Sequence, residues 1–365
     1  MTPPMKIAFF GSSLLSAYWN GAATYYRGII SALARRGHRV TFYEPDAFDR
    51  QSHRDMEEPD WAKVVVYGAE TTKELNRCLL EASSADVLIK ASGVGVFDEY
   101  LEAAVLRMRR QESPVLFWDV DAPATLDRLR AEPSDAFRPL IPRYDAILTY
   151  GGGLSVVDAY RSLGARDCVP IYNALDPESH HPVDPDPRFQ ADLCFLGNRL
   201  PDREQRVDEF FLRPAGILRD RKFLLGGSGW ADKRMPENVD YAGHVYTADH
   251  NAFNCTPRAV LNISRDSMAR YGFSPATRVF EAAGAGACLI TDVWRGIESF
   301  LEPGREVLLA DSGEEVARTL RELSASRAAE IGQAARHRVL AEHTYDHRAA
   351  EVETIFRELL ATRRD

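Results

Sequence analysis

The chain has 365 residues, of which 45% are hydrophobic, so it is long enough to bury two cores of ordinary domain size. Its 54 acidic residues outnumber its 45 basic ones and give a formal net charge of -9. This balance leaves no basic surplus for neutralising a phosphate backbone, which disfavours a nucleic-acid partner. The sequence therefore predicts a globular protein of two domains that binds no nucleic acid.

The five cysteines are odd in number, widely spaced and mostly set within apolar runs; they are Cys78, Cys168, Cys194, Cys255 and Cys288. This pattern favours reduced core thiols over a disulfide framework or a zinc site. No apolar run approaches the roughly 20 residues of a membrane span, and the amino terminus leads straight into a strand-like run. We therefore expect a soluble, cytoplasmic protein without a membrane span.

Short apolar runs alternate with amphipathic stretches along the first half of the chain. The runs have the length and composition of buried strands, and the stretches have helical spacing. The strands are expected at residues 6–10, 39–43, 63–67, 86–90, 114–118, 146–150 and 168–172, and the clearest helices at 22–36, 72–82 and 97–110. This alternation predicts a doubly wound parallel sheet covered by helices.

A proline-rich, strand-poor segment at residues 173–190 interrupts the alternation and predicts an interdomain linker. The alternation then restarts, with strands expected at 192–196, 222–225, 239–243, 259–263, 287–291 and 306–309, and helices at 203–212, 276–284, 313–323 and 326–340. We expect two Rossmann-like domains, residues 1–175 and 176–345. The remaining residues, 346–365, are expected to form a helix that packs back across the domains.

Ligands bind parallel sheets at the carboxyl ends of the strands, so the loops that follow strands are the first candidate sites. The loop after the first strand begins at Gly11, ends at Gly21 and leads into a helix. Both glycines would let the backbone approach a ligand, and the helix N-terminus would favour a phosphate, unless the loop is a plain connection. The loop lacks the Gly-x-Gly-x-x-Gly spacing of dinucleotide binders, which disfavours a NAD-dependent dehydrogenase.

Two arginines follow the first strand of the second domain, Arg199 and Arg203. Guanidinium groups hold phosphate oxygens in forked, charge-assisted hydrogen bonds, so this pair could grip a diphosphate. The alternative is a solvated helix start with Asp202 as its N-cap.

Two further loops of the second domain are candidates for nucleotide binding. A glycine-rich turn after the next strand contains Gly227, where a ligand could approach the backbone closely. Backbone groups of His244 and Val245, after the third strand, could read the edge of a base.

The richest segment, residues 261–292, runs from a strand through a polar loop and a helix to another strand. Ser274 or a neighbouring residue is expected to cap the helix, with Pro275 near its first turn. Arg278 then lies early in the helix, and Glu281 lies three residues later on the same face. The Glu281 carboxylate could accept both hydroxyls of a ribose. The alternative is an ordinary intrahelical ion pair between Arg278 and Glu281.

On this segment the chain resembles the group 1 glycosyltransferases, and more narrowly their CgeB-like branch, which is named after a spore-maturation protein. The matching residues are Arg-Val-Phe-Glu-Ala-Ala-Gly-Ala-Gly-Ala-Cys-Leu-Ile-Thr-Asp at 278–292, Gly-Ile-Glu at 296–298, Pro-Gly-Arg-Glu-Val at 303–307, His-Thr-Tyr at 343–345, and Arg348. The resemblance covers residues 192–350 well and the first domain only in its layout.

The resemblance implies an α/β protein of GT-B fold, with two Rossmann-like doubly wound parallel-sheet domains and an interdomain cleft. It implies that the nucleotide lies mainly on the second domain and the acceptor on the first, and that transfer is metal-independent and retaining. Glu281 matches the ribose-binding Glu of the family, and Arg199 and Arg203 match its diphosphate ligands. Phe273 stands where the family has the Glu that orients the donor sugar, so that contact is missing or supplied differently.

The sequence Asp119-Val-Asp121 imitates the Asp-x-Asp motif with which single-domain GT-A enzymes hold a metal and a sugar nucleotide. Because a whole second Rossmann-like half is present, we favour a different interpretation. Asp119 and Asp121 would contact the acceptor or a sugar hydroxyl, or Asp121 would act as a base. The alternative is that Asp121 caps a helix beginning near Pro123.

The histidines give no metal site. His180 and His181 adjoin in the linker and are expected to face solvent, while His244 and His250 are closer to the nucleotide side. None of them has the spacing of a metal pair.

These observations predict a hexosyltransferase-type glycosyltransferase without a cofactor. It would move a sugar from a UDP- or TDP-linked donor to an unknown acceptor, which is a small molecule, a glycan or a protein. Arg199, Arg203, Arg278 and the helix start would stabilise the leaving diphosphate. One alternative is a sugar-nucleotide epimerase of the same fold, which would turn over the donor with no acceptor. Another is a non-catalytic protein that binds a nucleotide sugar and never releases free nucleotide.

Overall fold

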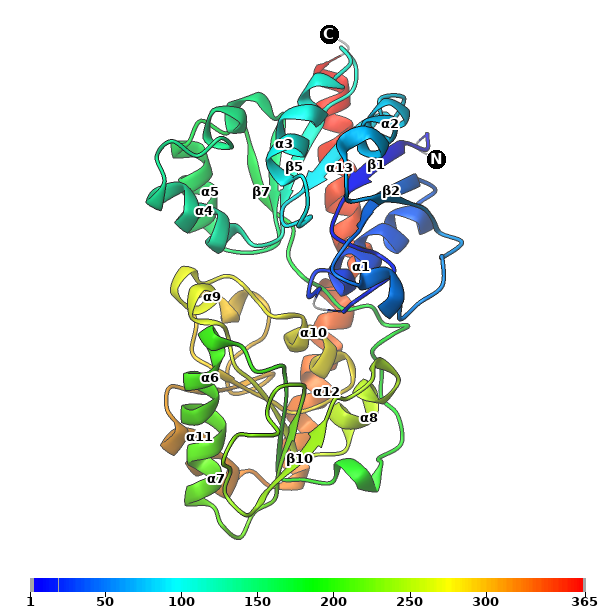
Figure 1. Cartoon of the computed structure of the whole chain (residues 1–365). Helices are drawn as coiled ribbons and strands as arrows, with labels where there is room; N and C mark the ends of the chain where they lie inside the picture. The colour runs from blue at the N-terminus through cyan, green and yellow to red at the C-terminus, as the bar shows by residue number, and fades with distance from the viewer. Residues whose placement is uncertain (1–2, 19, 364–365) are drawn as a thin grey trace. The chain divides into compact units, whose positions relative to one another are not determined.

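The computed structural model describes residues 3–18 and 20–363, apart from the side chain of Asp202, and they form two compact units. One unit holds the chain up to Asn173 together with the residues from Tyr345 onward, and the other is Ala174–Thr344. The first junction lies close to the boundary expected after residue 175. Each unit is built around one parallel sheet (Figure 1).

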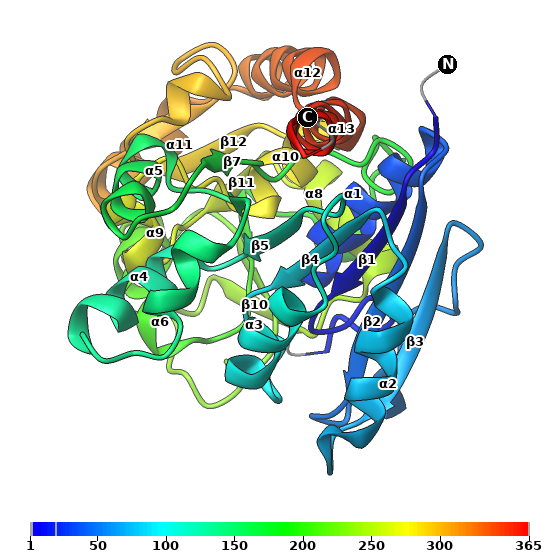
Figure 2. The same cartoon turned by 90° about the horizontal axis from the view of Figure 1, so that it is seen from above.

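The sheet of the first unit has seven parallel strands in the order β3-β2-β1-β4-β5-β6-β7, and Figure 2 shows β3, β2, β1, β4 and β5 side by side in this order. The strands are β1 Lys6–Phe10, β2 Arg39–Asp46, β3 Ala62–Gly68, β4 Val87–Ala91, β5 Val115–Asp119, β6 Ala146–Thr149 and β7 Cys168–Pro170. The strand order reverses between β1 and β4, which is where open α/β sheets bind ligands. The sequence predicts all of these strands because each is a short, mainly apolar run; the central strands β1, β4, β5 and β6 are buried on both faces, while the edge strands β3 and β7 are partly exposed.

The helices of the first unit are α1 Ala23–Arg35, α2 Thr72–Ala82, α3 Asp98–Arg107, α4 Ala122–Ala131, α5 Gly153–Ser162 and α13 Tyr345–Thr362, with 3-10 turns η1 Arg50–His53 and η2 Arg138–Arg143. Aromatic rings fill the space between α1 and the sheet. Phe9 stacks on Phe42 with a centroid distance of 5.3 Å, and Tyr26 meets Phe9 edge-on at 5.4 Å. The expected helices at 22–36, 72–82 and 97–110 are confirmed, and α5 is an addition.

Helix α13 lies beside α1, so the last helix of the chain belongs to the first unit (Figure 1). The Tyr345 ring packs edge-on against Tyr25 of α1 at a centroid distance of 6.2 Å. Arg36 Nε lies 2.6 Å from Glu353 Oε2, and Arg35 pairs with Asp346. Apolar packing and ion pairs therefore fix α13 on α1.

The sheet of the second unit has six parallel strands in the order β10-β9-β8-β11-β12-β13. They are β8 Leu193–Leu196, β9 Phe223–Gly226, β10 Val239–Gly243, β11 Ala259–Asn262, β12 Leu289–Asp292 and β13 Leu308–Ala310. All six were expected from the sequence. The central strands β8, β9, β11 and β12 bury both faces, and Phe195, Leu225 and Leu261 are at most 1% exposed, whereas the edge strand β10 is largely exposed.

The helices of the second unit are α6 Pro201–Val207, α7 Arg213–Ile217, α8 His250–Cys255, α9 Asp266–Tyr271, α10 Thr277–Gly284, α11 Gly313–Glu322 and α12 Ala325–Glu342. Its shorter turns are η3 Pro187–Phe189, the π-helical η4 Asp208–Leu212, η5 Thr247–Asp249 and η6 Ile297–Ser299. The helix expected at 203–212 is thus the run α6, η4 and α7. Helices α10 and α12 pack against each other, as Figure 1 shows.

The five cysteines are free thiols, and all except the partly buried Cys255 are buried, as the sequence predicts. Within residues 3–18 and 20–363, none of the helices combines the length and the apolarity needed to cross a membrane.

Candidate functional site

Helix α10 starts after the loop that follows β11, so its first turn lies at the carboxyl edge of the second sheet. Its N-cap residue is Ala276, and no side chain caps the helix. Ser274, the expected cap, instead donates a hydrogen bond from Oγ to the carbonyl oxygen of Gly272 at 3.0 Å. The first-turn N–H groups of α10 therefore have no side-chain acceptor, which is the condition under which a helix start binds an anion.

Arg278 lies in this first turn and makes no hydrogen bond or ion pair with any described residue. Its Nη1 atom is buried and unpartnered, and its Cζ atom lies 5.6 Å from the centroid of the Phe195 ring. Burial lowers the pKa of Arg278, although the charge of Glu281 opposes that shift. The ion pair between Arg278 and Glu281 that the sequence left open does not form. A buried guanidinium without a carboxylate is costly unless a ligand completes it.

Glu281 lies one turn further along α10, next to His180 and within the electrostatic reach of His250. Its Oε1 atom lies 3.8 Å from Nε2 of His180, and its side chain is 14% exposed. His180 is 6% exposed, so the expectation that it faces solvent is wrong. It is buried because the linker lies against α10, where the His180 carbonyl oxygen approaches Gly284.

His250, the first residue of α8, is the second of these histidines. Its Nε2 atom lies 3.3 Å from the carbonyl oxygen of Val245. Burial lowers the pKa of His250, the charge of Glu281 acts to raise it, and those of Arg278 and His180 lower it further. A carboxylate, a guanidinium and two imidazoles thus share one electrostatic environment. The adjacent histidines of the linker and the position of His250 after the third strand were the available signals in the sequence.

Arg199 and Arg203 have different environments. Arg199 holds Glu204 through two hydrogen bonds, of 2.9 Å from Nε and 2.7 Å from Nη2, and its Nη1 lies 3.0 Å from Asp232. These carboxylates pair with its guanidinium in the described structure, so a diphosphate would have to compete with them, and the expected role of Arg199 as a diphosphate ligand stays a prediction. Arg203 extends to the end of β8, where its Nη1 atom lies against Gly197.

The helix after β8 starts differently from the expected one. Leu200 is the N-cap residue of α6, and Pro201 is the first helical residue. The expected cap, the side chain of Asp202, lies outside the described part of the chain.

Gly227 holds two strand ends together. Its φ is +116°, and a Cβ atom there would lie 2.3 Å from the carbonyl oxygen of Gly197. Its N–H donates to the carbonyl oxygen of Gly243 at 2.7 Å, so the turns after β8, β9 and β10 meet at this residue. The backbone of Gly197 lies in close contact with Gly227, and the approach of a ligand to Gly227 stays a prediction.

The residues after β10 differ in exposure. Val245 is buried, and its carbonyl faces His250. His244 is exposed and meets the ring of Tyr246 edge-on at 4.7 Å. This segment thus lies next to His250, with the side chain of Val245 buried and that of His244 exposed to solvent.

Phe273 occupies the position at which the resemblance implies a Glu. It has a φ of +45°, and its N–H donates to the carbonyl oxygen of Arg295 at 2.6 Å. The Arg295 guanidinium lies over its ring at 5.5 Å, and the ring packs against Gly296. This position provides an aromatic ring held by an arginine and no carboxylate.

In the first unit, Gly11 ends β1. Its N–H donates to the carbonyl oxygen of Tyr43 at 3.1 Å, and a Cβ atom there would lie 2.4 Å from the Phe42 ring. Packing on Phe42 therefore requires a glycine at this position. Gly21 is exposed with open space around it, just before the Ala22 N-cap of α1.

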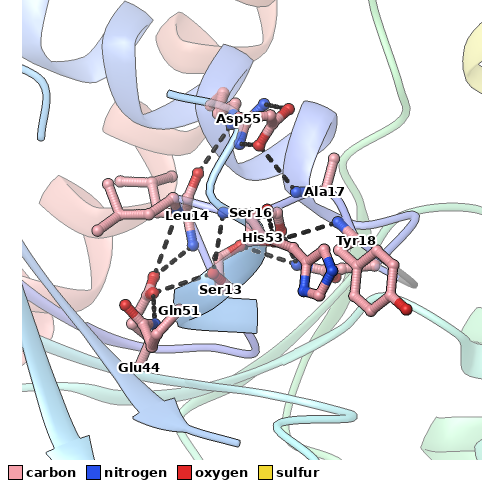
Figure 3. Close-up of polar contacts among 12 residues, drawn as sticks. Ser13, Leu14, Ser16, Ala17, Tyr18, Glu44, Gln51, His53 and Asp55 are labelled. Atoms are coloured by element: carbon pink, nitrogen blue, oxygen red, sulfur yellow. Dashed lines mark hydrogen bonds and ion pairs between the residues drawn. The ribbon is translucent and has the colours of Figure 1, made fainter. Parts of the chain in front are cut away.

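The loop between these glycines is fixed by two carboxylates, as Figure 3 shows. Glu44 accepts hydrogen bonds from Ser13 Oγ at 2.9 Å and from the Leu14 N–H at 2.5 Å. Asp55 accepts from the Ala17 N–H at 3.0 Å and forms two hydrogen bonds with Arg27. Residues 13–17 of the loop are thus held at the carboxyl end of β1 by these two carboxylates.

Asp119 and Asp121 do not form a pair. Asp119 is fully buried and accepts hydrogen bonds from Ser92 Oγ at 2.7 Å, Tyr160 OH at 2.5 Å, Thr125 Oγ1 at 3.1 Å and the Asp121 N–H at 3.0 Å. These four donors occupy the Asp119 carboxylate in the described structure, and its expected contact with the acceptor or a sugar hydroxyl stays a prediction. Asp121 is the N-cap residue of α4 but makes no side-chain cap, and its half-buried carboxylate stays the candidate base.

A cavity of about 450 Å³ in the second unit lies elsewhere, at the amino-terminal ends of β8, β9 and β11. It is lined by Asp192, Lys222 and Arg258, among others. Arg258 and Arg221 already pair with Asp192 there. Parallel sheets bind ligands at the opposite edge, so this cavity is not the candidate site.

Comparisons with known proteins agree with this architecture. Residues 203–354 match the glycosyl transferase-like family Glyco_trans_1_2, whereas no curated protein matches the sequence. HepE from Anabaena, solved with UDP and glucose, is similar in structure, with a TM-score of 0.68 and 13% identity over 97% of this chain and 100% of that chain.

Two further solved structures are similar over most of their length. Sucrose-phosphate synthase from Thermosynechococcus elongatus has a TM-score of 0.70 and 14% identity, over 98% of this chain and 100% of that chain. An alpha-glucosyltransferase solved with UDP-glucose and DNA has a TM-score of 0.70 and 13% identity, over 97% and 100%. The chain therefore has the GT-B fold of these glycosyltransferases, and residues 203–354 form a glycosyltransferase-like domain.

Proposed function

We propose that the protein is a glycosyltransferase that transfers a hexose from a UDP- or TDP-linked donor to an acceptor hydroxyl. The observation that carries this proposal is Arg278, a half-buried arginine whose buried Nη1 atom has no partner among the described residues, in the uncapped first turn of α10. An anion held there would meet the guanidinium and the helix start together. HepE and the alpha-glucosyltransferase, both of this fold, were solved with UDP or UDP-glucose, which makes UDP the first nucleotide to test.

In the proposed complex the second unit binds the donor. Arg278 and the α10 amides hold the diphosphate, with Arg203 as an additional ligand at the end of β8. Glu281 accepts hydrogen bonds from the ribose hydroxyls, and Val245 lies on the base side. Phe273, in place of a carboxylate, contacts the sugar through an apolar ring, so donor recognition differs from that of the group 1 pattern.

The proposed reaction breaks the bond between the anomeric carbon and the diphosphate oxygen. The acceptor hydroxyl oxygen forms the new bond to that carbon, and its proton passes to Asp121 or to the departing diphosphate. Arg278 stabilises the charge that develops on the leaving diphosphate. Retention, metal-independent transfer, the CgeB-like branch and a cytoplasmic location belong to the same proposal and rest on the sequence pattern. The acceptor stays open among small molecules, glycans and proteins, and the absence of nucleic acid stays a prediction from charge.

The test begins with thermal-shift measurements of the full chain against UDP- and TDP-sugars. Acceptor-dependent release of free nucleotide is then measured with the donor that stabilises the protein most. We expect stabilisation by one donor class, and loss of that stabilisation in Arg278→Gln and Glu281→Gln. Glu322→Gln, an exposed position on α11, is the matched control and should behave as the wild type.

The outcomes separate the proposal from its alternatives. Conversion of the donor sugar without an acceptor would indicate an epimerase. Binding without nucleotide release under any acceptor would indicate a binding protein. Unchanged nucleotide affinity in both α10 variants would overturn the donor site.

A further inference from the structure

A second arginine without a carboxylate partner lies in the first unit, remote in sequence from the donor site. Arg50 begins η1, just after β2, and is 8% exposed. Its Nη1 atom donates to the carbonyl oxygen of Ser12 at 3.3 Å, while its buried Nε atom makes no hydrogen bond. Within the described chain it has no ion pair, and burial lowers its pKa. The positive charge is therefore enclosed with only one neutral acceptor, an arrangement that costs stability.

Glu44 is the carboxylate whose charge acts on the pKa of Arg50, but its oxygen atoms accept hydrogen bonds from other groups. It accepts hydrogen bonds from Ser13 Oγ at 2.9 Å, the Leu14 N–H at 2.5 Å and Gln51 Nε2 at 2.7 Å, as Figure 3 shows. Its charge attracts Arg50, but the two side chains form no ion pair. Glu44 thus organises the loop after β1 and leaves Arg50 without a counter-ion in contact.

The hydroxyl of Tyr26 is a second buried donor in the same environment. Tyr26 is fully buried, and burial raises the pKa of its hydroxyl, although an interaction with the Ser12 side chain opposes that shift. Arg50 and Tyr26 interact electrostatically, and both are close to Ser12. The buried Nε donor of Arg50, which has no acceptor among the described residues, points to a ligand that supplies one.

An exposed aromatic ring adjoins this pair. The Phe48 ring is 5.0 Å from Arg50 Cζ and packs on the backbone of Gly95, yet Phe48 is 55% exposed. Phe48 and Asp49 both have left-handed backbones, with φ of 59° and 55°, so the turn holds the ring beside the arginine at some conformational cost. A flat apolar face and a buried cation are thus side by side.

Arg50 and Phe48 lie next to the point of the first sheet, between β1 and β4, at which the strand order reverses. Ser12 follows β1, Phe48 and Arg50 follow β2, and Gly95 follows β4, so all of them sit at the carboxyl ends of neighbouring strands. Open α/β sheets bind ligands at this place, beside the point where the strand order reverses.

We infer that Arg50 and Phe48 form an acceptor subsite for an anionic sugar, with a phosphate or carboxylate group on Arg50 and the apolar face of the sugar ring on Phe48. The inference rests on the proposed function, because only a glycosyltransferase has an acceptor. The planar guanidinium matches both kinds of oxyanion, and the anion replaces the counter-ion that Arg50 lacks. The aromatic ring supplies the apolar surface of a small-molecule site, and the anion fixes the orientation of the ligand.

The experiment is calorimetric titration of the full chain with glucose 6-phosphate, glucuronate and glucose. We expect one of the two anionic sugars to bind at least tenfold more tightly than glucose, and its identity tells phosphate from carboxylate. Arg50→Gln should weaken binding of that anionic sugar at least tenfold. Arg54→Gln, an exposed arginine four residues further on whose guanidinium bonds only to Gln51, is the matched control and should change it less than twofold.

A second variant keeps the test valid if Arg50→Gln does not fold. Phe48→Ala removes an exposed ring, so it should fold, weaken all three sugars several-fold and keep the preference for the anionic one. Equal binding of all three sugars, no binding of any of them, or equal losses in Arg50→Gln and Arg54→Gln would each overturn the subsite.

UDP titrations run in parallel distinguish this inference from the proposed function. Arg50→Gln should leave the affinity for UDP unchanged. Glu281→Gln should abolish UDP binding and leave the affinity for the anionic sugar unchanged. If UDP does not bind but the sugar still depends on Arg50, the proposed function falls and the anion site stands. If UDP binds and the anionic sugars show no preference, the subsite alone falls.

Discussion

Nε2 of His180 lies 3.8 Å from Oε1 of Glu281, although His180 belongs to the linker and Glu281 to α10. The imidazole limits the orientations of the carboxylate that we propose to bind ribose. We expect His180→Ala to reduce UDP affinity about three- to tenfold, less than Glu281→Ala, because it frees the carboxylate without removing it. Titration calorimetry of both variants and of the double variant measures the coupling.

The control for this prediction is the neighbouring residue. His181 is exposed, and the hydrogen bond of its ring within the described structure is with the carbonyl oxygen of Pro182, so His181→Ala should leave UDP affinity unchanged. Strictly additive effects of His180→Ala and Glu281→Ala would mean that the two side chains do not act together.

We expect Arg278 to lower the free energy of unfolding of the protein and to be required for binding of the donor diphosphate. Because its buried guanidinium has no partner among the described residues, Arg278→Met should raise the free energy of unfolding by roughly 1–3 kcal/mol. The same variant should lose UDP affinity at least tenfold, since the diphosphate then lacks its cation. Urea denaturation and calorimetry check the two effects separately, and a less stable variant would argue against an unpaired charge.

Substitution of Asp119 should affect stability, whereas substitution of Asp121 should affect turnover. Asp119→Ala leaves four donors of the first unit without an acceptor and should lower the free energy of unfolding by about 2–5 kcal/mol. Asp121→Ala should reduce turnover more than donor affinity and change stability little. Each variant is the control of the other, measured by denaturation and by steady-state kinetics. Equal turnover in the wild type and Asp121→Ala would remove Asp121 as the base.

The contact of α13 with α1 should depend on pH. Burial alone would raise the pKa of Glu353, but hydrogen bonds from Arg357 and Arg36 outweigh it and lower the pKa to about 2. A carboxyl with a lowered pKa stabilises the fold above its unfolded pKa of about 4.5, and this contribution disappears as the pH falls toward 2. We expect a loss of roughly 1–3 kcal/mol over that window.

Glu353→Gln is the variant for this prediction. It should be less stable than the wild type at neutral pH and show a smaller decrease in stability between pH 4.5 and 2. Parallel stability curves for the two proteins would contradict the role of the carboxylate.

The parallel sheets were accessible from the sequence, because buried strands of such sheets are local apolar runs separated by amphipathic helices. Runs such as 6–10 and 239–243 match β1 and β10 residue for residue. The helices α8 and α9 were missed because each has only six residues, too few for a helical period to show.

For the candidate site, too, some features follow from the sequence and others only from the tertiary structure. The sequence alone determined the strand–loop–helix frame that places Arg278 and Glu281 at the carboxyl edge of a sheet, since that follows from local pattern and chain order. Only the tertiary structure decided which charges have partners: Arg199 pairs with Glu204 and Asp232, Asp119 accepts from four donors, and Arg278 and Arg50 have no ion pair with a carboxylate in the described part of the chain. The physical reason is that ion pairing and burial depend on distances between segments far apart in the chain, and no local pattern of residues encodes those distances.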